Sequence, residues 1–112
     1  MKREKLFLIT DSSFLGRKLK EFEWEFIDAK LIDGFYRNKE GNLAGASISM
    51  VEAVQNAIQY LNVTVEEAVS MATLRVAKAI KMDHNLGAIK VGYPASFIKF
   101  SNDFKQYETM IF

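Results

Sequence analysis

The residue best placed for chemistry is Asp11, which stands just beyond the apolar run Leu6–Ile9. Four consecutive apolar residues are typical of a strand buried on both faces. A carboxylate at the C-terminal end of such a strand lies where α/β enzymes place their catalytic groups. Burying that charge is costly unless it is paired, so a catalytic role is one explanation. The alternative is a turn with a helix N-cap at Thr10–Ser12, because Asp and Ser favour both.

The other residue types that carry chemistry are scarce. The chain has 112 residues, no cysteine and a single histidine, His84, so thiolate metal sites and histidine clusters are excluded. His84 is expected on the surface or capping the end of a helix, where the helix dipole favours it. The formal net charge of +1 and the absence of a basic stripe argue against nucleic-acid binding.

Length and hydropathy limit the class of protein further. The length corresponds to one domain at most. No apolar run approaches the ~20 residues of a membrane span. The apolar stretch behind the charged N-terminus is too short for a signal peptide. We therefore expect a cytoplasmic protein without membrane partners.

The elements that would position Asp11 begin with β structure. The expected segments are a strand at Lys5–Ile9, a loop at Ser12–Lys20, strands at Phe22–Phe26 and Ala29–Ile32, and a return strand at Phe35–Arg37. Apolar residues at every second position of Phe22–Phe26 indicate a strand with one wet face. Asp33-Gly34 predicts a two-residue hairpin turn, because both residues tolerate positive φ.

The pattern then changes to helical spacing. Ser49 and Glu52 form a capping box that predicts a helix ending near Asn62, and Thr64 and Glu67 repeat it for a second helix. Thr73 is expected to cap a third, shorter helix that closes at Asn85–Gly87. The remaining expected elements are strands at Ala95–Phe100 and Tyr107–Phe112.

The order of these elements and several local words resemble one enzyme family. The words are Leu8-Ile9-Thr10-Asp11, Gly41-Asn42-Leu43-Ala44-Gly45, Ser49-Met50 and the long run Thr64–Thr73, followed by Leu86-Gly87-Ala88-Ile89. Together they resemble the C-terminal part of N-acetylglucosamine-6-phosphate deacetylases, in the metal-dependent amidohydrolase superfamily. The resemblance covers nearly the whole chain.

The resemblance implies an α/β fold that forms part of a larger enzyme. Residues 1–20 would be the last strand of a (β/α)8 barrel with its active-site loop, and residues 21–46 a β-hairpin section of a small composite β domain. Residues 47–87 would supply three helices that close the barrel. Residues 88–112 would be the C-terminal strands of the β domain.

The resemblance also implies a reaction. In the family, a metal-activated water hydrolyses the acetamide of an amino-sugar phosphate, with the residue matching Asp11 as general base and then general acid. Residues Ile48, Ser49 and Met50 match a segment that approaches the sugar, so they are candidate substrate contacts. The simpler alternative for Ser49 is a helix cap and for Met50 a core residue.

The family's metal ligands, a Glu and two His, lie upstream of the matching region, as do the His and Arg that hold acetamide and phosphate. The complete enzyme would therefore use a divalent metal (zinc or similar), but this chain alone is predicted to bind none and to be inactive. The departures from the family words indicate a divergent member: Ser12 replaces the usual Ala, Gly45-Ala46 replaces Gly-Ser, and Arg75-Val76-Ala77 replaces Asn-Pro-Ala.

An unpaired strand at Lys5–Ile9 would expose apolar side chains and free edges. We therefore expect self-association or pairing with an N-terminal barrel segment. Two alternatives to a deacetylase segment stay open. One is a truncated, non-catalytic oligomerising module in which Asp11 is only a turn residue. The other is a segment of a different amidohydrolase, of the adenine deaminase or dihydroorotase type, although Gly41–Met50 favours the sugar deacetylase.

Overall fold

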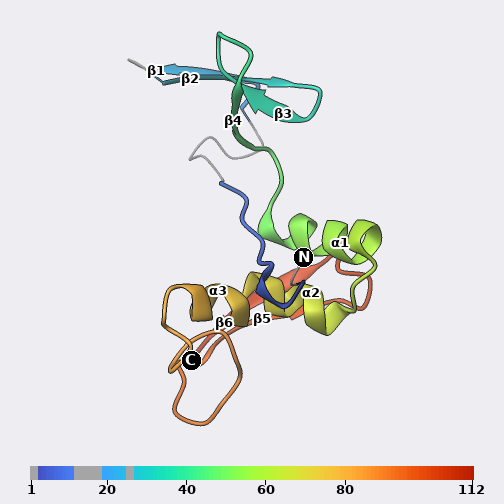
Figure 1. Ribbon diagram of the computed structural model, residues 1–112, viewed down its shortest axis with the longest axis vertical. Coiled ribbons are helices and arrows are strands. Elements are labelled where there is room, and N and C mark those ends of the chain that lie inside the picture. The colour runs from blue at the N-terminus through green and yellow to red at the C-terminus, as the bar shows by residue number, and fades with distance from the viewer. Residues whose placement is uncertain (1–2, 12–18, 25–26) are drawn as a thin grey trace. The chain divides into compact units, whose positions relative to one another are not determined.

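The computed structural model describes residues 3–11, 19–24 and 27–112, and these divide into two compact units rather than the one domain expected from length. We call Met1–Leu8 with Val54–Phe112 the helical unit, and Ile9–Ala53 the sheet unit. Figure 1 labels the elements of both. In chain order they are a 3-10 turn at Arg3–Lys5, β1 (Glu21–Trp24), β2 (Ile27–Ile32), β3 (Phe35–Arg37), β4 (Leu43–Ala46), α1 (Met50–Leu61), α2 (Val65–Ala72), α3 (Leu74–Ala79), β5 (Ser96–Phe100) and β6 (Tyr107–Ile111).

The sheet unit is an antiparallel meander in which β1, β2, β3 and β4 are neighbours in that order. The predicted hairpin is confirmed, because Ile32 pairs with Phe35 across a turn in which Asp33 and Gly34 have φ of 51° and 81°. Positive φ at both positions is the geometry of a two-residue hairpin turn. The expected loop residues Ser12–Lys18 and the strand residues Glu25–Phe26 lie outside the described residues.

The sheet unit has its own small core. Ala29 and Tyr36 are buried, with Leu31 and Ala44 packed against them. The Tyr36 hydroxyl donates to the Leu19 carbonyl at 3.1 Å, so its polar end is satisfied while the ring is buried. This core is separate from that of the helical unit, which is why the chain forms two units.

In the helical unit, Val54 and Ala57 of α1 form a buried cluster with Val63 and with Ala68 of α2. Met71, in the last turn of α2, is fully buried as well. The cap predicted for α2 is confirmed, because the Thr64 hydroxyl accepts the Glu67 N–H at 3.1 Å. Every helix in the described part of the chain is too short or too polar to traverse a bilayer.

Helix α3 differs from the prediction at both ends. The Thr73 hydroxyl donates to the Val69 carbonyl at 2.8 Å, so it bonds back to α2 and makes no side-chain cap for α3. The helix ends at Ala79, because Lys81 has φ of 60° and Met82 N–H closes the turn onto the Ala77 carbonyl. A left-handed residue of this kind commonly terminates a helix, and it does so here before Asn85 is reached.

The last two strands are confirmed as the antiparallel hairpin β5–β6, with Phe97 opposite Met110 and Phe100 opposite Tyr107. The loop of this hairpin is tied to α1, because Gln55 Nε2 donates to the Phe104 carbonyl at 3.1 Å. The α/β class expected from the sequence is confirmed.

The predicted strand at Lys5–Ile9 is not observed, and Leu6–Asp11 carries no strand pairing. A strand requires a neighbour for its backbone N–H and C=O groups. Within the described residues, β1–β4 and β5–β6 pair among themselves and none of them pairs with this segment. Phe7 and Ile9 consequently remain 42% and 72% exposed.

Candidate functional site

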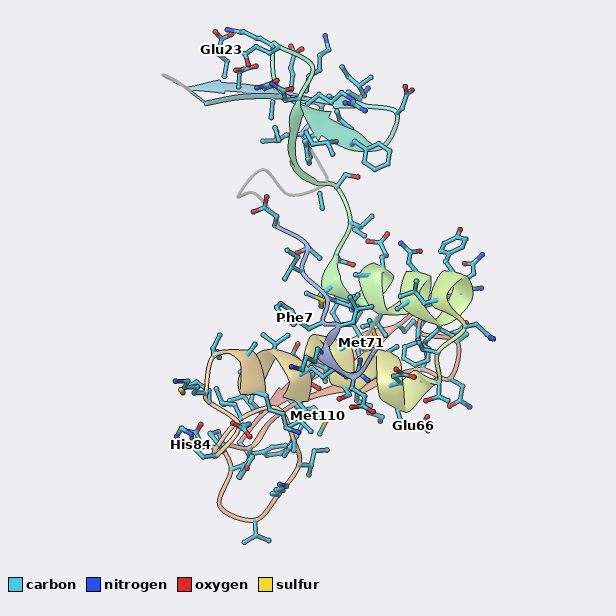
Figure 2. All side chains as sticks on the ribbon, in the orientation of Figure 1. Phe7, Glu23, Glu66, Met71, His84 and Met110 are labelled. Carbon is cyan, nitrogen blue, oxygen red and sulfur yellow. The ribbon has the colours of Figure 1, made fainter. Side chains whose placement is uncertain are left out.

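The segment that leads to Asp11 is held by the helices of the helical unit. The Leu6 carbonyl accepts a hydrogen bond from Arg75 Nη1 at 3.0 Å, and the Leu8 N–H donates to the Met71 carbonyl at 2.9 Å. The Leu8 side chain packs against the core between α1 and α2. Figure 2 shows Phe7 where this segment runs past Met71. Helices α2 and α3 therefore hold Leu6 and Leu8 within the helical unit.

Asp11 follows this anchored segment and belongs to the sheet unit. It is exposed and has φ of 46°, a left-handed conformation that Asp tolerates better than most residues. The positive φ changes the chain direction at the carboxylate itself. This geometry fits a turn residue and also an acid presented at the rim of a site, so the catalytic role stays a prediction.

The candidate substrate contacts Ile48, Ser49 and Met50 are half-buried at the start of α1. The Ser49 hydroxyl donates to Glu52 Oε2 at 2.8 Å and accepts the Glu52 N–H at 3.3 Å, while the Ser49 N–H donates to the same carboxylate at 2.8 Å. This is a complete capping box, so the cap alternative for Ser49 is confirmed. Substrate contact by Ile48, Ser49 and Met50 stays a prediction. Asp11 and these residues belong to the same unit.

The capping role of Ser49 can be tested by its effect on stability. We expect Ser49→Ala to lower the free energy of unfolding by about 0.5–2 kcal/mol, the usual effect of losing an N-cap. Urea denaturation of the chain measures this loss. Thr64→Ala is the matched control, because it removes the other helix cap at a position with no predicted substrate contact. Stability unchanged by Ser49→Ala would contradict the capping role.

A metal site is not found among the residues that the structure describes. No three His, Cys, Asp or Glu side chains of that set lie close enough together to hold a metal ion. His84 is exposed in the turn that follows α3, which fits the surface role expected for it (Figure 2). The side chains of this part of the chain therefore do not fit the divalent metal that the family resemblance implies.

A surface hollow on β1 and β2 is lined by charged side chains, and its lysines are paired with glutamates. Lys39 Nζ pairs with Glu23, and Lys30 Nζ lies 3.5 Å from Glu21. The hydrogen bond and charge of Glu23 raise the pKa of Lys39 above its usual value. These exposed pairs compensate one another, which is typical of a solvated surface.

One contact of the Leu6–Leu8 segment was not predicted from the sequence. In the sequence, Arg75 is only a departure from the family words, and one of its two partners lies far away in the chain. Its guanidinium contacts both Leu6, 69 positions earlier, and Glu67 of α2. The spacing of residues in the sequence cannot predict a contact between Leu6 and Arg75, which are 69 positions apart.

Comparison with known proteins gives matches over almost the whole chain. The sequence profile described as the amidohydrolase family matches residues 5–111. The N-acetylglucosamine-6-phosphate deacetylase of Haemophilus influenzae is 31% identical over 99% of the chain. The N-acetylgalactosamine-6-phosphate deacetylase of Shewanella sp. strain ANA-3 is 37% identical over 89% of it.

A solved structure agrees with these sequence matches. The crystal structure of N-acetylglucosamine-6-phosphate deacetylase from Pasteurella multocida superposes on 96% of the chain with a TM-score of 0.87 and 34% identity. The chain spans 30% of the Haemophilus protein, 25% of the Shewanella protein and 29% of the Pasteurella chain. The resemblance predicted from the sequence words is thus confirmed across the chain.

Proposed function

This chain belongs to the amidohydrolase family, and we propose that it forms the C-terminal part of a deacetylase acting on an N-acetylated amino-sugar phosphate. The observation that carries this proposal is the structural match to a deacetylase over 96% of the chain at a TM-score of 0.87. The proposal assigns the chain only a part of the enzyme, because the Haemophilus and Pasteurella proteins are more than three times as long.

We assign the parts of the chain as the family resemblance implies. In the complete enzyme, Lys5–Ile9 would form the last barrel strand and helices α1–α3 would close the barrel. Strands β1–β4 and β5–β6 would be the C-terminal share of the small β domain. The anchoring of Leu6 and Leu8 on the helical unit supports this assignment, because a barrel strand is covered by helices on its outer side.

The proposed partner is an N-terminal barrel segment that pairs with Lys5–Ile9. Phe7 and Ile9 are 42% and 72% exposed, and an apolar surface of this kind favours contact with another polypeptide. Pairing would also satisfy backbone groups that a strand at this position leaves open. Self-association of the chain is the competing outcome, and sedimentation of the chain alone distinguishes a monomer from a dimer.

The proposed chemistry centres on Asp11. Its carboxylate takes a proton from the water that attacks the acetamide carbonyl carbon, and then passes a proton to the nitrogen as the C–N bond breaks. The products are acetate and the free amine of the sugar phosphate. A single positioned carboxylate is suited to both transfers, because it is the base in the first step and the acid in the second. We assign no metal ligand to this chain.

The substrate class is an N-acetylhexosamine 6-phosphate. The relatives include enzymes named for N-acetylglucosamine-6-phosphate and for N-acetylgalactosamine-6-phosphate, with similar identity to this chain. The two sugars differ in the orientation of one hydroxyl group. Both therefore belong in the assay.

The test compares the chain alone with a grafted enzyme. In the grafted enzyme, this chain replaces its matching segment in the Pasteurella multocida deacetylase. We expect the 112-residue chain to release no acetate from either substrate with added Zn²⁺ or other divalent metal ions, since its described residues offer no ligand set. We expect the grafted enzyme to release acetate.

The control is the same host protein with the matching segment deleted. Turnover by the chain alone would overturn the proposed division of the site. A folded grafted enzyme without turnover on either substrate would contradict the proposed function, and circular dichroism establishes whether the graft is folded.

A further inference from the structure

We infer that the segment Leu6–Leu8 accepts a neighbouring strand on one edge only, through the backbone N–H and C=O groups of Phe7. The neighbour belongs to the N-terminal part of the complete deacetylase. This inference rests on the proposed function and specifies how the proposed partner binds. It uses contacts of the helical unit alone, to which the whole segment belongs.

One edge of the segment is occupied by helices. The Leu6 carbonyl accepts a hydrogen bond from Arg75 Nη1 of α3 at 3.0 Å, and the Leu8 N–H donates to the Met71 carbonyl of α2 at 2.9 Å. Leu6 and Leu8 are half-buried, whereas Phe7 between them is 42% exposed. Such alternation is the pattern of an extended chain with one covered face. The backbone groups of Leu6 and Leu8 therefore share the edge that α2 and α3 hold.

The contact with Arg75 keeps a second strand away from this edge. The same guanidinium donates from Nη2 to Glu67 Oε1 at 3.1 Å, and the side chains of Arg75 and Glu67 are only 16% and 26% exposed. Charge-assisted hydrogen bonds in such a half-buried place are stronger than those of exposed ion pairs. A strand on this edge would have to displace both Arg75 from Leu6 and Met71 from Leu8.

The opposite edge of the segment is open. In an extended chain, the N–H and C=O groups of successive residues point alternately to the two edges. Those of Phe7 therefore point away from the edge that α2 and α3 hold. Among residues 3–11, 19–24 and 27–112, neither backbone group of Phe7 has a hydrogen-bond partner. Open backbone groups beside an exposed apolar ring are suited to the addition of a strand.

The occupant that fits this edge is the N-terminal part of the enzyme. The Haemophilus and Pasteurella proteins have more than two thirds of their length outside the match, so a complete enzyme has the chain to supply a neighbour. The apolar run Leu6–Ile9 suits a strand covered on both faces. Pairing of two copies through the Phe7 edge would give a sheet of only two strands, and sheets usually have more.

Amide hydrogen exchange in the 112-residue chain and in the grafted enzyme tests the pairing. In the dilute chain alone, we expect the Phe7 amide to exchange at nearly its intrinsic rate and the Leu8 amide to be protected. In the grafted enzyme, we expect exchange of the Phe7 amide to slow by at least about tenfold, since one net hydrogen bond has an effect of that order. The Leu8 amide should be protected in both proteins.

Two substitutions at Phe7 form a matched pair. Phe7→Ala and Phe7→Pro both remove the ring, but only proline also removes the N–H. In the grafted enzyme, we expect a lower urea midpoint for Phe7→Pro than for Phe7→Ala. In the chain alone, the two variants should have similar midpoints, because the N–H has no partner there among the described residues. Equal midpoints in the grafted enzyme would contradict pairing through this N–H.

The outcomes separate the inference from the proposed function. Phe7 exchange that is equally fast in the chain and in a folded, active grafted enzyme would overturn the pairing and leave the deacetylase proposal intact. Phe7 protection that rises with the concentration of the chain alone would make a second copy the occupant, against the inference. If Arg75→Ala lowers the urea midpoint of the chain but not of the grafted enzyme, a second strand has replaced the helices and the single-edge pairing is wrong. A folded grafted enzyme without turnover contradicts the proposed function, while Phe7 exchange still decides the pairing.

Discussion

In the grafted enzyme, we expect Asp11→Asn to lower kcat by about a hundredfold to ten-thousandfold, the range that general acid–base catalysis contributes. The amide keeps the size and the turn preference of the carboxylate, but it cannot accept the proton of the attacking water. Substrate binding should change little, so KM is expected to stay close to that of the parent. Initial rates of acetate release over a range of substrate concentrations measure both constants.

The chain offers a closely matched control for this substitution. Asp33 is also exposed, lies in the same unit and has φ of 51° against 46° for Asp11. Asp33→Asn therefore removes one carboxylate from a turn of the same backbone conformation, at a position with no assigned chemistry. Equal activity of the two variants would reduce Asp11 to a turn residue. Unchanged circular dichroism and urea midpoints would show that any loss at Asp11 is chemical.

The β meander and the helix starts could be predicted because each depends on neighbouring residues. The Asp33-Gly34 turn requires only that two adjacent residues accept positive φ, and the pairing of Ile32 with Phe35 follows from it. The Ser49–Glu52 capping box is likewise local, since its hydrogen bonds join residues three positions apart. Local rules of this kind can be recognised in the sequence alone.

The prediction of a strand at Lys5–Ile9 was wrong for this chain, because a strand forms only beside another strand. The apolar run has the composition of a buried strand, yet the described residues offer it no neighbouring strand. Its backbone instead forms hydrogen bonds with the Met71 carbonyl and the Arg75 guanidinium. The apolar run is suited to a buried strand between two neighbours. Without a neighbouring strand among the described residues, it is observed as an unpaired segment.

The candidate site was predictable to a similar extent. Asp11 is a candidate because of its place after an apolar run, and its catalytic role stays a prediction. The Ser49 cap could be predicted from the sequence and is observed. The contact of Arg75 with Leu6 could not be predicted, because it depends on the folded path of the N-terminal segment past α3. The end of α3 was missed for a related reason. Asn85–Gly87 has the sequence of a helix terminus, but Lys81 adopts the left-handed conformation first.

Gly87 has another role, and it leads to the largest stability change that we expect. It has φ of 85°, and a Cβ atom built on it would lie 2.8 Å from Leu74 Cα and 2.9 Å from Ala77 Cβ. The loop after α3 therefore packs directly on the backbone of its first turn. We expect Gly87→Ala to lower the free energy of unfolding by about 2–5 kcal/mol, combining left-handed strain with overpacking against backbone. Urea denaturation measures the change.

Gly92→Ala separates these two contributions. Gly92 has φ of 88°, almost the same as Gly87, but a Cβ atom there would meet nothing within 4 Å. We expect Gly92→Ala to lose only the conformational part, about 1–2 kcal/mol. The difference between the two variants then measures the close approach of the loop to α3. Equal losses would mean that the loop moves away from Leu74 at no cost.

The same pair of variants tests whether the loop after α3 supports the contact of Arg75 with Leu6. Leu74 is the neighbour of Arg75, so a loop pushed outward by Ala at position 87 would shift the first turn of α3 and the guanidinium with it. We expect Gly87→Ala to speed exchange of the Leu8 amide at urea concentrations where the chain is still folded, and Gly92→Ala to leave it unchanged. If Leu8 exchange follows global unfolding in both variants, the first turn of α3 does not transmit the displacement.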